Sequence, residues 1–152
     1  MSDVVRDVAA KRGLPPERKH LIEVGNALRR DHGPGVLALE ILARLEGRAV
    51  VDSIRNPAEV AVLRDALARF VLIGVTAPLD TRFRRSLARA RPGDPTTRHA
   101  FAERERQENA SDPTSQQLDE TFRLADHVVE NAGDLDELRS AVDRWLDEIA
   151  AE

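Results

Sequence analysis

The fold class is decided by the stretch Phe70-Val71-Leu72-Ile73-Gly74-Val75. It is a continuous apolar run rich in β-branched residues, typical of a strand buried on both faces of a parallel sheet. Before it lies a helix start, in which Asn56 is the N-cap, Pro57 takes the first helical position and Glu59 closes the cap. After it, residues 78–89 show a second helical pattern. A strand between two helices predicts an α/β protein with a parallel sheet.

Two shorter apolar runs predict further strands, at Ala49–Asp52 and at His127–Glu130. The rest of the chain predicts helices over residues 3–12, 17–30, 36–45, 97–109, a short stretch ending near 124, and the segment after Asp134. The last helix carries an apolar stripe that we expect to be buried, formed by Leu135, Leu138, Val142, Trp145, Leu146 and Ile149. No internal repeat or linker interrupts the chain, so we expect one domain over residues 1–152.

The amino-acid composition of the chain excludes several classes of function. The chain has 152 residues and no cysteine, which excludes disulfides, thiol nucleophiles and thiolate metal ligands. Its four histidines lack the spacing of a zinc motif, namely His20, His32, His99 and His127. No apolar run reaches the roughly 18 residues of a membrane span, and residues 1–6 show no signal peptide. We therefore expect a cytoplasmic protein that is no zinc hydrolase and has no membrane partner.

Charge is spread unevenly, although the net charge is only −4. Residues 82–106 hold eight arginines and three acids, a balance of +5, whereas residues 107–152 hold thirteen acids and three arginines, a balance of −10. Lys11 and Lys19 are the only lysines. Because the planar fork of arginine suits phosphate, the basic block predicts an anion site.

Two groups of residues are candidates for chemistry. Asp52 follows the first predicted strand, where a carboxylate can hold a hydrated magnesium ion, and Arg55 can reach a phosphate. The alternative is that Asp52 only ends the strand and Arg55 is solvated. Arg85 and Arg89 share one helix face, and their mutual repulsion would be relieved by a bound anion. The alternative here is a solvated face paired with Glu103 and Glu105.

Several segments resemble one superfamily. Ser2-Asp3-Val4-Val5-Arg6 resembles the Gly-Asp-x-x-Arg start of the nucleotide-binding helix in adenylate kinases, and Val51-Asp52-Ser53-Ile54-Arg55 resembles their Asp-Gly-x-x-Arg element. Residues 77–85 with Arg89 are similar to the lead into the lid of dephospho-CoA kinases. Residues 91–104 resemble a lid segment, and residues 125–133 resemble the last strand and the adenine loop. Over almost its whole length the chain resembles P-loop nucleotide kinases of these two types.

The resemblance implies roles for particular residues. Asp3, Arg6 and Arg55 would bind the acceptor substrate, and Asp52 would orient Mg²⁺ through water. A helical lid over residues 82–110 would close on the phosphates and stabilise charge in the transition state through Arg85, Arg89, Arg91 and Arg104. The adenine of ATP would lie near Asn131 and Gly133.

The chain departs from this superfamily in its phosphate loop. It has no Gly-x-x-x-x-Gly-Lys-Ser/Thr sequence, and neither Lys11 nor Lys19 follows a glycine-rich run. By resemblance, about 30 residues, one strand–crossover–strand unit, are absent before Met1. We expect a truncated P-loop kinase-like three-layer fold with a parallel sheet reduced to about three strands. The absent strand would leave open sheet edges, through which the chain could self-associate.

Two functional interpretations follow. In the first, the chain is the C-terminal portion of an ATP-dependent kinase for a nucleotide or a dephospho-CoA-like molecule, and is not catalytically competent by itself. In the second, it is a non-catalytic module that binds a nucleotide or a partner. Nucleic acid is a weaker interpretation, because the chain is acidic overall and contains only four Phe and one Trp.

Overall fold

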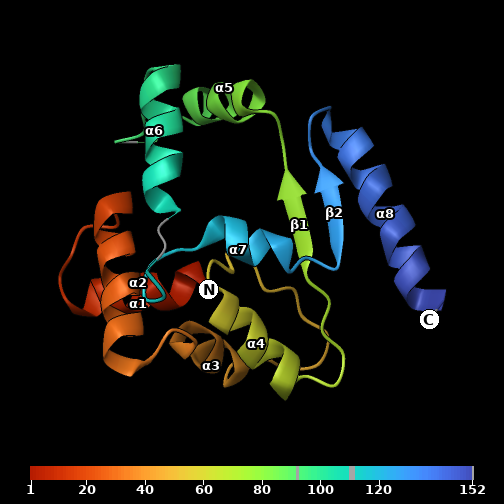
Figure 1. Cartoon of the computed structure of the whole chain (residues 1–152), viewed down its shortest axis with the longest axis horizontal. Coiled ribbons are helices and arrows are strands. Elements are labelled where there is room, and N and C mark those ends of the chain that lie inside the picture. Colours follow the sequence, from red (N-terminus) through yellow and green to blue (C-terminus); the bar gives the residue numbers. More distant parts are fainter. Residues whose placement is uncertain (92, 110–111, 152) are drawn as a thin grey trace.

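The computed structural model describes residues 1–91, 93–109 and 112–151. Within them the chain forms eight helices and one small parallel sheet, which confirms the α/β class (Figure 1). The elements are α1 (Ser2–Lys11), α2 (Arg18–His32), α3 (Val36–Leu42), α4 (Pro57–Ala66), β1 (Ile73–Thr76), α5 (Leu79–Arg89), α6 (Arg98–Glu108), α7 (Leu118–Arg123), β2 (His127–Glu130) and α8 (Leu135–Ala151).

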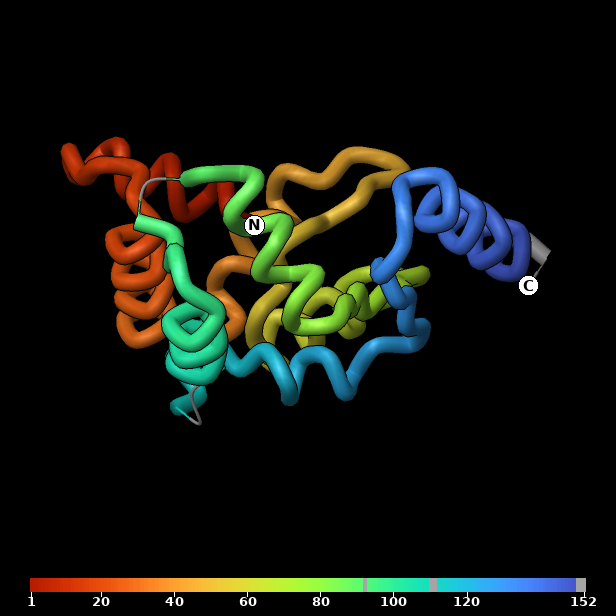
Figure 2. The backbone as a smooth tube through the Cα atoms, turned by 90° about the horizontal axis from the view of Figure 1, so that it is seen from above, coloured from red at the N-terminus to blue at the C-terminus, as the bar shows by residue number. Residues whose placement is uncertain are grey.

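The main hydrophobic core lies among the first four helices. Apolar residues at helical spacing on α1 pack against α2 and α3, and α3 packs against α4. The buried cluster comprises Met1, Val4, Val5, Ala9, Val24, Leu37, Ala38 and Leu63. Figure 2 places α1 and α2 at one end of the molecule and α8 at the other. The sheet therefore lies between a well-packed helical end and an exposed one.

The predicted start of α4 is confirmed as a capping box. The Asn56 side chain accepts a hydrogen bond from the Ala58 N–H at 2.9 Å, and the Glu59 carboxylate accepts one from the Asn56 N–H at 3.1 Å. The Asn56 amide also donates to the carbonyls of Pro113 and Ser115, at 2.7 and 3.0 Å. These bonds fasten the segment before α7 to the start of α4.

The predicted strands near residues 70–75 and 127–130 pair in parallel, as expected. Gly74 lies beside Val128 and Val75 beside Val129. Gly74 allows a close approach, since a Cβ there would lie only 2.7 Å from the Phe122 ring of α7. On the opposite face, His127 contacts Trp145 of α8 with ring centroids 5.3 Å apart. Helices α7 and α8 thus cover opposite faces of the sheet.

The predicted strand Ala49–Asp52 is wrong, and the sheet has two strands rather than about three. Val50 is 97% exposed, whereas Val51 packs against the helical core. In the described part of the chain β1 pairs with β2 alone, so residues 49–52 have no ladder partner. The left-handed φ of +64° at Ser53 also turns the backbone away from an extended path directly after Asp52.

The expected burial of the α8 stripe is also wrong. Leu135 and Leu146 are exposed, and Leu138, Val142, Trp145 and Ile149 are only half-buried. Helix α8 packs along β2, at the right of Figure 1, and this narrow contact cannot cover the whole stripe. Among the described residues, no helix is both long enough and apolar enough to cross a membrane.

Candidate functional site

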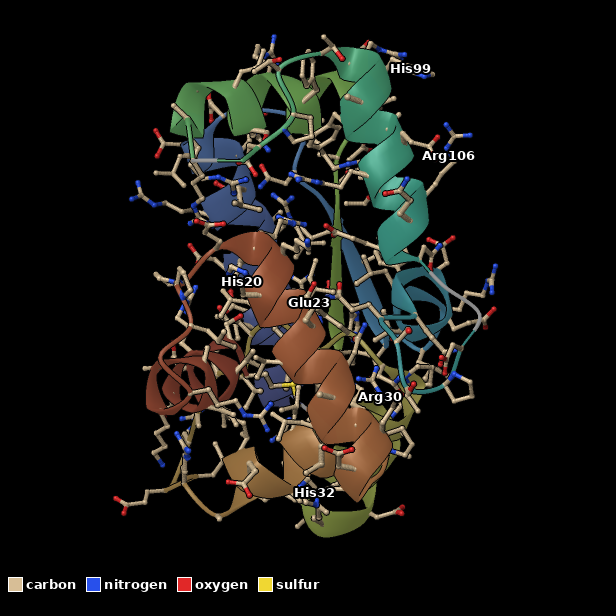
Figure 3. All side chains as sticks on the ribbon, turned by 90° about the vertical axis from the view of Figure 1, so that its left-hand side faces the viewer. His20, Glu23, Arg30, His32, His99 and Arg106 are labelled. Atoms are coloured by element: carbon tan, nitrogen blue, oxygen red, sulfur yellow. The ribbon has the colours of Figure 1, made fainter. Side chains whose placement is uncertain are left out.

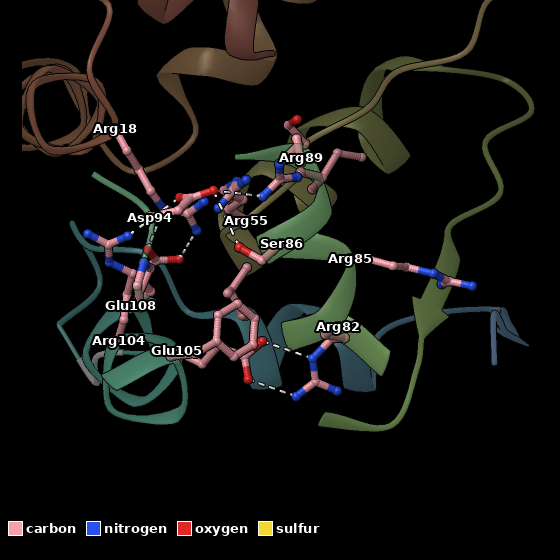
Figure 4. Close-up of a pocket in the computed structure, with 15 residues that line it drawn as sticks. Arg18, Arg55, Arg82, Arg85, Ser86, Arg89, Asp94, Arg104, Glu105 and Glu108 are labelled. Atoms are coloured by element: carbon pink, nitrogen blue, oxygen red, sulfur yellow. Dashed lines mark hydrogen bonds and ion pairs between the residues drawn. The ribbon is translucent and has the colours of Figure 1, made fainter. Parts of the chain in front are cut away.

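A cavity of about 470 Å³ lies where α2, α5, α6 and the segment before α4 meet. We call it the arginine pocket (Figure 4). Its polar wall contains six arginines and three acids, which are Arg18, Arg55, Arg82, Arg85, Arg89, Arg104, Asp94, Glu105 and Glu108. At neutral pH these nine side chains sum to a charge of +3. Phe101, Leu118, Ile54 and Pro95 supply the apolar part of the wall.

Two bidentate ion pairs fix the helices around this cavity. Arg82 of α5 donates to both carboxylate oxygens of Glu105 on α6, each at 2.8 Å. Arg18 of α2 donates to Glu108 at the other end of α6, at 2.7 and 2.5 Å. These hydrogen bonds raise the pKa of Arg82 and the pKa of Arg18. Helix α6, which buries none of its described residues, is therefore held mainly by its charges and by the Phe83–Phe101 contact.

Asp94 lies among the arginines of the pocket. Its carboxylate is 3.3 Å from Arg89 Nη2 and 3.6 Å from Arg104 Nη1, and it accepts a hydrogen bond from the Ser86 hydroxyl at 3.3 Å. Only 10% of the Asp94 side chain is exposed. Ala90, at the end of α5, has a left-handed φ of +49° that starts the turn toward Asp94. The chain thus places one of its own carboxylates where an anion would contact Arg89 and Arg104.

Arg55 faces the same pocket without a carboxylate partner among the described residues. Its Nη1 donates to the side-chain oxygen of Gln116 at 2.9 Å, and its backbone N–H donates to Glu59 at 2.8 Å. Burial, and then the positive charge of Arg18, lower the pKa of Arg55. A half-buried guanidinium that is not neutralised by a carboxylate is a favourable partner for an anionic ligand.

Arg85 connects α5 to the loop after β2. Its guanidinium donates to the backbone carbonyls of Asn131 and Gly133, at 2.7 and 2.9 Å. Arg85 is exposed and lines the arginine pocket, whereas Asn131 and Gly133 lie outside it. The predicted adenine-loop residues therefore lie next to the pocket, with Arg85 as the link.

The sequence-predicted residues are only partly brought together. Four of them line one cavity, namely Arg55, Arg85, Arg89 and Arg104. Arg91 is exposed and lies outside the pocket. Asp3 and Arg6 pair with each other at 2.9 Å on the exposed side of α1, also outside it. Of the range 82–110 predicted as a lid, Pro92 and Ala110 lie outside the described residues.

The Asp52 carboxylate lies outside the arginine pocket, beside the N-terminus. Its carboxylate is exposed and lies 3.7 Å from the amino group of Met1, which donates to the Asp52 carbonyl at 3.1 Å. In the part of the chain that the structure describes, no three His, Cys, Asp or Glu residues are grouped so that they could hold a metal ion. Asp52 therefore lies apart from the arginine pocket, and its action on a hydrated Mg²⁺ stays a prediction.

Sequence reasoning missed several residues of the pocket. Arg82 could have been found, because Arg82, Arg85 and Arg89 recur at the spacing of one helix face. Arg18 and Glu108 are 90 residues apart, and no local pattern predicts that they meet. Gln116, which is buried and holds Arg55, also lies in a segment without a recognisable motif.

No known family profile matches the sequence. The chain is, however, similar to archaeal proteins named UPF0200 protein. It is 32% identical over 156 residues to one from Hyperthermus butylicus, which covers 100% of this chain and 81% of the relative. It is 35% identical over 149 residues to one from Halobacterium salinarum, which covers 93% and 75%. It is 28% identical over 157 residues to one from Pyrococcus horikoshii, which covers 98% and 82%. The identity and the coverage together show that the chain belongs to the UPF0200 family.

Proposed function

We propose that the arginine pocket binds the phosphate groups of a nucleotide or nucleotide-like ester. The observation that carries this proposal is that six arginines, from four separate segments of the chain, line one cavity with only three acids. Guanidinium groups bind phosphate through charge-assisted and often bidentate hydrogen bonds. A cavity whose wall carries net positive charge attracts anions and raises their local concentration.

The proposed role of the chain is that of the acceptor- and lid-bearing portion of an ATP-dependent small-molecule kinase. Phosphoryl transfer depends mainly on positioning and on stabilising charge, and we assign this role to Arg55, Arg89 and Arg104, which line the cavity. Helices α5 and α6 would form the lid. The contacts of α6 with α2 and α5 are mainly ion pairs, so a shift of α6 would exchange charged contacts rather than expose a hydrophobic core.

Catalysis would need groups that these residues do not supply. The sequence has no Gly-x-x-x-x-Gly-Lys-Ser/Thr loop, whose backbone N–H groups and lysine bind the β- and γ-phosphates of ATP. We therefore propose binding of ATP and Mg²⁺ only when this chain acts together with a segment that carries such a loop. The acceptor roles of Asp3 and Arg6, the metal role of Asp52, the lid role of Arg91 and the adenine contacts of Asn131 and Gly133 stay predictions.

A non-catalytic binding module is the second candidate. One observation favours it: every carboxylate lining the arginine pocket is paired with an arginine, Glu105 with Arg82, Glu108 with Arg18, and Asp94 with Arg89 and Arg104. Paired in this way, none is available as a general base for a substrate hydroxyl. Such a pocket would bind phosphate esters without turnover.

Calorimetric titration with pyrophosphate tests the proposal. We expect binding to the wild-type chain, at least about tenfold weaker binding to Arg55→Ala, and unchanged binding to Arg139→Ala. Arg139 is a matched control, since it is an exposed arginine paired with Asp136 on α8. Absence of pyrophosphate binding to the wild type would overturn the proposal. An assay of the chain alone with ATP, Mg²⁺, AMP and dephospho-CoA should show no turnover under either candidate, and turnover would contradict both.

A further inference from the structure

A second cavity, of about 360 Å³, adjoins the arginine pocket. It lies between α2, α6 and the segment before α7, and we call it the amide pocket. Figure 3 looks onto this side of the molecule, with α6 above α2 and Glu23 labelled on α2. The two cavities share Arg18, Arg104 and Glu108 as lining residues. The Arg18–Glu108 ion pair therefore lies at the boundary between the two cavities.

The amide pocket has a different chemistry from its neighbour. Three of its residues are amides, Asn26, Gln107 and Gln116, and Ile22 and Ser115 lie beside them. Arg18, Arg104 and Lys19 are opposed by Glu23 and Glu108, so the charges of its wall nearly cancel. A wall of this kind suits an uncharged polar group rather than a second phosphate.

The contacts of the three amides leave specific atoms free to recognise a ligand. The Asn26 oxygen accepts from Arg29 at 3.4 Å, and the Gln116 oxygen accepts from Arg55 at 2.9 Å. The Gln107 nitrogen donates to Glu103 at 3.3 Å. With these bonds in place, and no other partner among the described residues, Asn26 and Gln116 each keep an N–H₂ donor and Gln107 keeps a carbonyl acceptor.

We propose that the amide pocket binds the uncharged organic part of the same ester whose phosphates bind the arginine pocket. The matching chemical group carries hydrogen-bond acceptors next to a donor, as the edge of a nucleobase or a secondary amide does. This inference rests on the proposed function and adds to it a ligand of two parts, a phosphate chain and an amide-like group. Gln116 joins the two sites, because it holds Arg55 in one and lines the other.

Three ligands that share a diphosphate test this inference: pyrophosphate, ADP and dephospho-CoA. We expect the wild type to bind at least one of the two organic esters about tenfold more tightly than pyrophosphate, because two or three further hydrogen bonds form. The double variant Asn26→Ala/Gln107→Ala should lose this advantage and keep its affinity for pyrophosphate. Arg89→Ala should weaken the binding of all three ligands by a similar factor.

The outcomes separate the two proposals. If pyrophosphate binds and neither ester binds more tightly, or if the double variant weakens pyrophosphate as much as the esters, the amide pocket is not a ligand site, although the arginine pocket remains one. If none of the three ligands binds the wild type, both proposals fail. An ADP advantage that disappears in the double variant assigns the amide-like group to the nucleobase. Because dephospho-CoA carries the same adenine, an advantage that only dephospho-CoA shows and that disappears in the double variant assigns the group to the pantetheine amide.

Discussion

Arg29 and Glu59 form an ion pair that is sealed from water beneath the arginine pocket. Their charged atoms are 2.7 Å apart, and their side chains are only 3% and 0% exposed. One oxygen of Glu59 accepts two hydrogen bonds from Arg29, and the other accepts from the backbone N–H groups of Arg55 and Asn56. One carboxylate thus satisfies a buried guanidinium, caps α4 and positions the backbone of Arg55.

Replacing Glu59 should therefore destabilise the protein strongly. Glu59→Ala leaves Arg29 buried and unpaired, and we expect a loss of about 3–5 kcal/mol in the free energy of unfolding. Urea denaturation measures this loss. Glu103→Ala is the control, because Glu103 pairs with Arg106 at the surface. A loss below about 1 kcal/mol for Glu59→Ala, as typical of an exposed pair, would show that Arg29 finds another partner.

Removing the internal carboxylate of the arginine pocket should strengthen anion binding. Asp94→Asn keeps the shape of the side chain but removes the charge that competes for Arg89 and Arg104. We expect affinity for pyrophosphate to rise by about tenfold at low salt, because opposite charges at this distance attract strongly in a partly buried site. Asp136→Asn removes an equal charge on α8 as a control. Weaker binding by Asp94→Asn would mean that Asp94 organises the pocket instead of competing for it.

Removing Arg89 should change binding but not stability. Arg89 is exposed and, among the described residues, its ion pair is with Asp94 at 3.3 Å; such pairs contribute little to folding. We expect the melting temperature of Arg89→Ala to stay within about 3 °C of the wild type. Thermal unfolding followed by circular dichroism measures it. A fall of ten degrees or more would make Arg89 a structural residue and would count against its assignment to phosphate.

The free edge of β1 should promote self-association. Among the residues described, β1 pairs with β2 alone, and Val75 on β1 is exposed. Unpaired backbone groups beside an exposed apolar side chain invite pairing with a second copy. We expect size-exclusion chromatography to show concentration-dependent dimers that Val75→Lys abolishes. Val50→Lys, at an exposed valine away from the sheet, is the control. A wild type that elutes as a monomer at all concentrations would contradict this prediction.

Local signals in the sequence predicted most of the helices and one strand pair. The capping pattern at Asn56 and Glu59 marks the start of α4 to the residue, because capping is a contact between near neighbours. The segment Ala49–Asp52 has the composition of a strand but no neighbour to pair with, and pairing is a property of the whole fold. The burial of the apolar stripe of α8 was also predicted wrongly, because burial depends on which elements cover the helix. Strand β2 covers only part of the stripe.

The site was predictable only where its residues are close in sequence. Arg85 and Arg89 follow the helical period on α5, and Arg104 belongs to the same basic block. Arg18 and Gln116 come from distant segments, and only tertiary packing brings them beside Arg55. The role of Asp94 as an internal anion depends on the turn at Ala90, which no sequence pattern indicates.

The most direct test of the central claim observes the arginines themselves. Nuclear magnetic resonance of the Nε–Hε groups, recorded while pyrophosphate is added, reports which guanidinium groups contact the anion. We expect the signals of Arg55, Arg89 and Arg104 to shift together with one saturating affinity, while those of Arg123 and Arg139, outside the pocket, stay in place. Equal small shifts at all arginines, or no shift at Arg55 and Arg104, would contradict the claim that this pocket binds phosphate.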